Sequence, residues 1–171
     1  VARIGRERRD EIRQRLRLHR HERLVLVSLG GIATHIDMQH WPGLCDVRWL
    51  VPAAWEVSRS DSRAIETLDM PFADLMRSCD ALIGKPGYGT FCEAACNGIP
   101  MLYVKRNDWP EEPYLVDWLK HHGRCLEIKR AELDRGALAA PLERLFALPQ
   151  RRRVTPFGID QVATYLAHGW F

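Results

Sequence analysis

A strand, loop, helix, strand pattern between residues 78 and 104 constrains the fold of this chain more than any other feature. A short apolar run leads into a turn that contains Gly84, Gly87 and Gly89. A helix pattern of small residues follows, closes at Gly98 and gives way to a second apolar run. In an open α/β sheet, such a turn leaves the N–H groups of a helix N-terminus uncovered at the end of a strand, where phosphate groups bind. The stretch therefore predicts a phosphate-binding turn in an α/β fold.

Apolar runs of strand length alternate with helix patterns along the rest of the chain. The predicted strands cover residues 24–29, 47–51, 64–68, 81–83, 101–104 and 124–128. The predicted helices cover residues 6–21, 72–78, 111–121, 131–148 and 159–167, one more lies between the glycine turn and Gly98, and residues 32–44 are a helix or a loop. Continuous apolar strands are typical of a parallel sheet that is buried on both faces. About six strands alternating with helices predict a Rossmann-like, doubly wound and mostly parallel α/β sheet.

Composition excludes several functional classes. The 171 residues are 46% hydrophobic, which is enough for a sizeable core, and the net charge of +3 is too mild for a dedicated nucleic-acid binder. Five cysteines without a Cys-x-x-Cys pair favour a reducing, cytoplasmic setting. There is no run of about 18 apolar residues and no signal peptide, so we expect neither a membrane span nor export.

The basic residues are concentrated at the start of the chain. Residues 1–23 carry nine arginines against four acidic residues, a local charge of +5. This segment is either a solvated helix that braces the sheet edge or an element between two domains. Because no initiator Met opens the sequence, we expect an upstream domain. The predicted organisation is a basic helix and linker (1–23), an α/β domain (24–150) and a C-terminal linker and helix (151–171).

A second glycine turn follows the first predicted strand. Gly30 and Gly31 form either an ordinary tight turn or a place where the backbone can approach a diphosphate without interference from a Cβ atom. The sequence around them lacks the G-x-G-x-x-G spacing of dinucleotide-binding folds, and the chain contains no P-loop pattern. Near the main turn, Lys85 either neutralises a phosphate or is a solvated surface lysine.

Thr90 and Glu93 have two interpretations. The Thr-x-x-Glu spacing is that of a capping box, in which both side chains bond to N–H groups of the first helical turn. Alternatively, Thr90 contacts a phosphate and the Glu93 carboxylate accepts hydrogen bonds from both hydroxyls of a ribose. Cys92 and Cys96 lie one turn apart on the same helix, without a matching pair of histidines, so we expect them to pack as small apolar residues. We expect no metal and no cofactor.

The motifs resemble a known family. Residues 79–94, followed by the Gly-Ile-Pro of residues 98–100, are similar to the donor-binding C-terminal half of GT-B glycosyltransferases of the family 28 type. The similarity is greatest to the glycosyltransferase-like domain of plant L-arabinokinases, whose Gly-Lys-x-Gly-Tyr-Gly-Thr and Asn/Pro-Glu-Glu-Pro patterns recur at residues 84–90 and 110–113. The resemblance covers most of residues 24–128. It implies a Rossmann-like domain that binds a nucleotide sugar, with a UDP-sugar as the candidate.

The resemblance also implies roles for individual residues. It assigns the diphosphate to the turns at Gly30-Gly31 and at residues 87–90, and the ribose to Glu93. It places the loop after the strand at 101–104 against the donor sugar, and the candidate contacts there are Asn107, Glu111 and Glu112. The two glutamates have an alternative role, because acidic residues in the first turn of a helix stabilise its macrodipole.

No catalytic residue is assigned, because GT-B enzymes carry the acceptor site and the usual general base largely in the N-terminal domain. The kinase half of the arabinokinases is absent, so kinase activity does not carry over. The predicted function is the donor-binding domain of a glycosyltransferase whose upstream domain is a partner in the same protein. The alternatives are a nucleotide-sugar-binding or regulatory module without catalysis, and a nucleotide-sugar hydrolase or epimerase.

Overall fold

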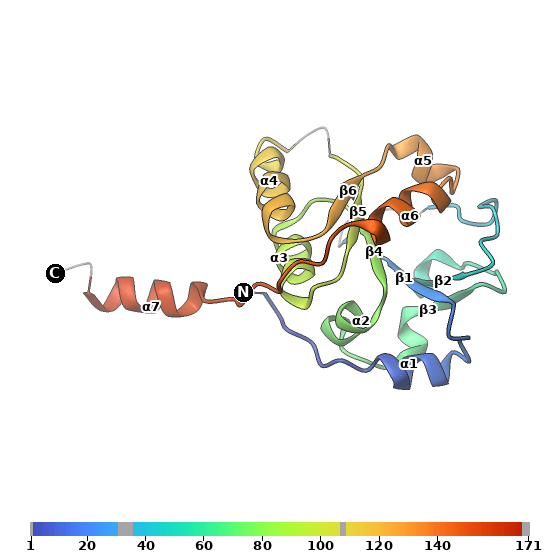
Figure 1. Cartoon of the computed structure of the whole chain (residues 1–171), viewed down its shortest axis with the longest axis horizontal. Helices are drawn as coiled ribbons and strands as arrows, with labels where there is room; N and C mark the ends of the chain where they lie inside the picture. Colours follow the sequence, from blue (N-terminus) through green and yellow to red (C-terminus); the bar gives the residue numbers. More distant parts are fainter. Residues whose placement is uncertain (1, 31–35, 107–108, 169–171) are drawn as a thin grey trace.

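The centre of the molecule is a six-stranded parallel sheet (Figure 1). The computed structural model describes residues 2–30, 36–106 and 109–168. The strands are β1 (Arg23–Val27), β2 (Val47–Val51), β3 (Ser62–Ala64), β4 (Ala81–Gly84), β5 (Met101–Tyr103) and β6 (Cys125–Glu127). Their order across the sheet is β3-β2-β1-β4-β5-β6, that of a doubly wound Rossmann sheet. The predicted fold class is confirmed.

Six helices in the described ranges cover both faces of this sheet. They are α1 (Arg9–Arg15), α2 (Phe72–Ser78), α3 (Tyr88–Asn97), α4 (Glu112–His122), α5 (Arg130–Asp134) and α6 (Ala139–Ala147). The described chain also contains α7 (Gly158–His168) and the 3-10 turns η1 (Ala53–Trp55) and η2 (Ile65–Leu68). Buried side chains of α1 to α4 share one core with Leu24 and Leu26 of β1. Those of α5 and α6 share the other core with Val25 and Val27. Alternate residues of one strand thus face two buried cores, which explains the continuous apolar runs in the sequence.

The predicted strand at residues 64–68 is wrong. Ser62–Ala64 form β3, and the next four residues form η2. The last pair in the ladder between β2 and β3 joins Val51 to Ala64. Trp49 N of β2 donates to Asp61 O at 2.8 Å, so the N–H groups of alternate residues of β2 face β3. The next such N–H after Val51 belongs to Ala53, and it donates instead to Glu66 Oε2 at 2.9 Å, so the ladder ends there.

The single helix predicted over residues 131–148 is also wrong, because the chain breaks into α5 and α6. Gly136 lies at the break with φ +65°, a left-handed conformation that favours glycine. A Cβ atom added there would lie 2.4 Å from Cγ of the buried Trp41. In this conformation the indole leaves no room for a side chain at position 136, so glycine is required at the break.

The two ends of the described chain differ in how they pack. The helix predicted over residues 6–21 forms only as α1, and Arg17 beyond it has a left-handed φ of +54°. Near the other end, Val154 N donates to Ala95 O of α3 at 3.3 Å, and the predicted C-terminal helix forms as α7. Figure 1 shows α7 projecting away from the sheet and its helices, and all of its residues are exposed. None of the helices within the described ranges is long and apolar enough to cross a membrane.

Candidate functional site

The two glycine turns lie next to each other at the point where the strand order reverses. Gly30 follows β1 and Lys85 follows β4, and these strands are parallel neighbours in the middle of the sheet. Ser28 N donates to Ile83 O at 2.9 Å, which ties the carboxyl ends of the two strands together. In doubly wound sheets, the crevice outside the carboxyl ends at this reversal is where ligands bind. The fold thus brings together two turns that are more than 50 residues apart in the sequence.

Lys85 spans the two turns. Gly30 has φ +73°, so its backbone adopts the left-handed conformation that glycine permits. A Cβ atom built on this glycine would lie 3.7 Å from Cε of Lys85. The lysine side chain therefore extends from the β4 turn over the β1 turn. Gly31, the other predicted residue of the first turn, lies outside the described residues.

Helix α3 presents its N-terminus at the same edge. Its N-cap is Gly87, without a side-chain capping bond, and Phe91 N donates to Gly87 O at 2.9 Å. The helix offers no acceptor for the N–H groups ahead of that bond, those of Tyr88, Gly89 and Thr90. They lie at the positive end of the helix dipole. A Cβ atom built on Gly89 would meet no other atom within 4 Å, so the surface here is open.

This geometry overturns the capping-box interpretation of Thr90 and Glu93. A capping box needs the threonine at the N-cap and the glutamate three residues later. The helix instead begins at Tyr88, so Thr90 lies in the first turn and Glu93 in the second. The partly buried Glu93 accepts a hydrogen bond on Oε1 from the backbone N of Arg3 at 3.1 Å.

The two glutamates of the β5–α4 loop have different environments. Glu112 is 4% exposed, and its Oε2 accepts a hydrogen bond from Arg106 N at 2.7 Å, so it holds the loop together. Glu111 is exposed, and its Oε2 accepts a hydrogen bond from the Tyr88 hydroxyl at 2.6 Å. That carboxylate raises the pKa of Tyr88. Asn107, the third predicted residue of the loop, lies outside the described residues.

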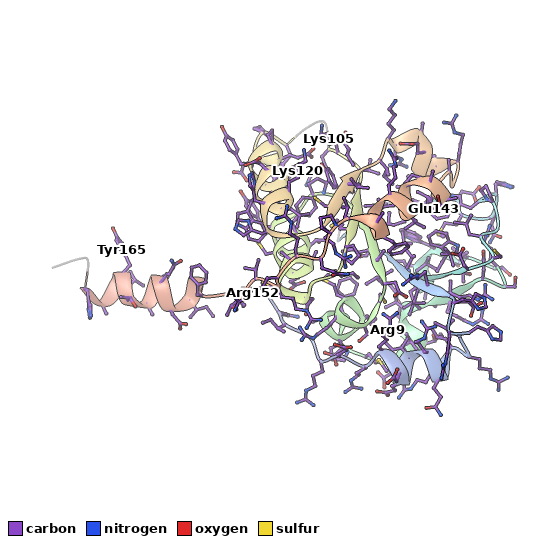
Figure 2. The ribbon with its side chains drawn as sticks, viewed as in Figure 1. Arg9, Lys105, Lys120, Glu143, Arg152 and Tyr165 are labelled. Carbon is purple, nitrogen blue, oxygen red and sulfur yellow. The ribbon has the colours of Figure 1, made fainter. Side chains whose placement is uncertain are left out.

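Aromatic contacts join this loop to the start of α3. The rings of Tyr88 and Trp109 meet edge to face, with centroids 5.4 Å apart, and the Arg106 guanidinium lies 5.1 Å from the Trp109 centroid. Figure 2 shows Lys105 beside the same loop, far from Arg9 on α1. The contact between Tyr88 and Glu111 was not predicted, because no local pattern links residues 23 positions apart.

Two other features do not form a site with these turns. An open hollow of about 500 Å³ is lined by residues 43–45 and 59–61, which precede β2 and β3 and so lie at the opposite edge of the sheet. Its charged pair is internally satisfied, since Arg59 Nε donates to Asp61 Oδ1 at 2.8 Å. Within the described ranges, no group of three or more His, Cys, Asp or Glu residues is arranged to hold a metal ion.

The comparisons with known proteins agree with the fold. No protein-family model matches the chain. An L-arabinokinase of Arabidopsis thaliana is 26% identical over 151 residues, which cover 82% of this chain and 14% of that protein. The structure of CalG4, the calicheamicin glycosyltransferase, matches with a TM-score of 0.63 at 17% identity. The match covers 88% of this chain and 44% of the CalG4 chain. For the glycosyltransferase SnogD from Streptomyces nogalater, the TM-score is 0.51 at 20% identity, over 75% of this chain and 36% of its own.

The structural similarities concern the fold. The chain spans less than half the length of each of the three proteins. Over that length, it has the Rossmann-like fold found in the GT-B glycosyltransferases. The resemblance that the glycine motifs indicate is therefore confirmed at the level of the fold.

Proposed function

We propose that this chain is the nucleotide-sugar-binding domain of a GT-B glycosyltransferase. The observation that carries the proposal is the meeting of two glycine turns, the Lys85 side chain and the uncapped N-terminus of α3 at the reversal of the strand order. Backbone N–H groups at an open helix N-terminus, with a lysine side chain between the two turns, are suited to a diphosphate. The fold shared with two glycosyltransferases is consistent with this ligand class.

In the proposed complex, the diphosphate lies against the N–H groups of residues 88–90, with Lys85 alongside. As an acceptor hydroxyl gives its proton to a general base outside this domain and attacks the anomeric carbon, the bond to the diphosphate breaks and negative charge grows on the leaving oxygen. The helix dipole and the lysine stabilise that charge without a metal ion. Glu93 accepts hydrogen bonds from the ribose hydroxyls, and Glu111 faces a hydroxyl of the transferred sugar.

A second candidate function is a nucleotide-sugar-binding module that performs no transfer. The similarity to an L-arabinokinase favours it, because this chain matches only 14% of a protein that is named for another reaction. Incubating the full-length protein with a radiolabelled nucleotide sugar separates the candidates. Labelled product that depends on an acceptor indicates transfer, release of free sugar indicates hydrolysis, and binding without turnover indicates the module.

The binding proposal is tested by thermal shift with UDP, GDP and ADP. At a concentration of 100 times its Kd, a ligand stabilises the folded state by about 2.7 kcal/mol. For a domain of this size we then expect a rise in Tm of roughly 5–10 °C for at least one of the three. Lys85→Ala should remove most of that rise, whereas Lys120→Ala on the exposed surface of α4 should retain it. No rise with any of the three diphosphates at millimolar concentration, or equal loss in both variants, would contradict the proposal.

A further inference from the structure

Residues 2–8, here called the strap, lie along α2 and α3. Three buried polar side chains of these helices bond to the strap backbone, and each is less than 7% exposed: Asp74, Ser78 and Asn97. Arg6 N donates to Asp74 Oδ1 at 2.8 Å, and Arg8 N donates to Ser78 Oγ at 2.7 Å. A buried polar group without a hydrogen-bond partner costs free energy, so these three side chains hold the strap in one position.

Steric contact defines the same position. A Cβ atom built on Gly5 would lie 2.0 Å from the carbonyl oxygen of Ala73, closer than any side chain can approach. The strap therefore passes against the start of α2 at a point where glycine alone fits. The backbone N of Gly5 donates to Asn97 Oδ1 at 2.9 Å.

Asn97 joins the strap to the part of α3 that carries Glu93. Its Nδ2 donates to Arg3 O and to Glu93 O, both at 2.9 Å. Arg3 in turn donates its backbone N–H to Glu93 Oε1 at 3.1 Å. One buried amide thus holds the strap so that its backbone reaches the carboxylate proposed to bind the ribose.

We infer that the strap positions Glu93 for the ribose diol, an inference that rests on the proposed function. An ionised carboxylate has about four acceptor sites, so one N–H from Arg3 leaves room for both ribose hydroxyls. With Oε1 held by a backbone that is itself anchored through Asn97, the carboxylate is oriented before the nucleotide arrives. Such preorganisation increases affinity because less freedom is lost on binding. Arg3 is in this account a positioning residue that acts through its backbone and not through its side chain.

The matched variants Arg3→Pro and Arg3→Ala test the inference. Proline removes the N–H that Glu93 accepts, whereas alanine keeps it and removes only the side chain. The readout is the ratio of affinities for UDP and 2′-deoxy-UDP in calorimetry, or for the corresponding pair of GDP or ADP if the thermal-shift screen selects that base. A site that bonds the 2′-hydroxyl should prefer the ribonucleotide by about tenfold. We expect Arg3→Ala to keep this ratio and Arg3→Pro to reduce it by at least threefold.

A general loss of stability would weaken the binding of both nucleotides equally and leave the ratio of their affinities unchanged. A change in this ratio therefore reports the positioning role. Gly5→Ala is a second route to the same result, because its side chain displaces the strap from Ala73. An unchanged ratio in Arg3→Pro overturns the inference while UDP binding itself stands. Failure of the wild-type protein to bind any of the ribonucleotides overturns the proposed function, and this inference with it.

Discussion

At the scale of single residues, the role of Glu93 depends on whether its carboxylate caps helix α3. The Thr-x-x-Glu spacing from Thr90 fits such a cap. The structure removes the cap, because α3 begins two residues before Thr90. The bond from Arg3, 90 positions away, could not be predicted, since no local pattern encodes a contact of that separation.

Replacing Glu93 by alanine should therefore affect binding more than stability. We expect affinity for the nucleoside diphosphate to fall at least tenfold, about 1.4 kcal/mol, because the ribose hydroxyls lose a charged acceptor. The free energy of unfolding should fall by no more than about 1 kcal/mol, since the side chain caps no helix and loses one hydrogen bond, from Arg3 N, while alanine is a good helix former. Calorimetry and urea unfolding measure the two quantities, with Glu143→Ala on α6 as the control. A folded Glu93→Ala protein of unchanged affinity would exclude the ribose role.

At the scale of secondary-structure elements, local signals predicted most of what forms. The bounds of β2 and α2 are those expected from the sequence, and Gly98 ends α3 with φ +74° as a helix-terminating glycine does. The errors came from partners elsewhere in the chain. Gly136 permits the break between α5 and α6 beside Trp41, and Glu66 accepts the Ala53 N–H that would extend the ladder to β3.

The N-terminus of α3 offers a test in which stability and binding move in opposite directions. Gly89 lies in the first turn with open space around its Cα. We expect Gly89→Ala to stabilise the fold by up to about 1 kcal/mol, because glycine is a poor helix residue. The added methyl group should at the same time weaken diphosphate binding several-fold, since it stands where the phosphate would lie. If thermal unfolding shows stabilisation while calorimetry shows unaltered affinity, the phosphate lies elsewhere.

An ion pair at the amino ends of the strands joins the buried Glu22, just before β1, to the partly exposed Arg48 of β2. Glu22 is 2% exposed, and it bonds to His19 N at 2.7 Å and to the Arg48 guanidinium at 2.5 Å. Burial alone would raise the pKa of Glu22, but the His19 N–H and the Arg48 charge outweigh it and lower that pKa below its ordinary 4.5.

This lowered pKa predicts the direction of a pH effect. The unfolded chain takes up the proton first as pH falls, so the contribution of Glu22 is complete above about pH 5 and is lost as pH decreases through the folded pKa. At pH 7, Glu22→Gln should be less stable by about 1–3 kcal/mol, and the difference should shrink towards pH 3. Urea unfolding at pH 7, 4 and 3 measures this difference in the free energy of unfolding, and Glu143→Gln is the exposed control. A difference that is the same at all three pH values would contradict the assignment.

At the scale of the whole molecule, alternating strands and helices predicted the class of fold but not the strand order. That order depends on which strands pair across the sheet. Because β1 pairs with β4, the turns that follow these two strands are neighbours. The sequence supplied the glycines of both turns, whereas the contact between Lys85 and the Gly30 turn and the path of the strap required the structure. The division into linker, domain and tail stays a prediction, and so does the cytoplasmic setting.

A nucleoside diphosphate is proposed to bind at the reversal of the strand order. An NMR titration of the ¹⁵N-labelled protein with UDP, or with GDP or ADP if the screen selects it, locates the bound nucleotide. We expect the largest changes in amide chemical shift at Tyr88, Gly89, Thr90 and Gly30, and little change at residues 43–45 and 59–61 around the open hollow. Shifts centred on that hollow, or no shifts at millimolar nucleotide, would contradict the proposal.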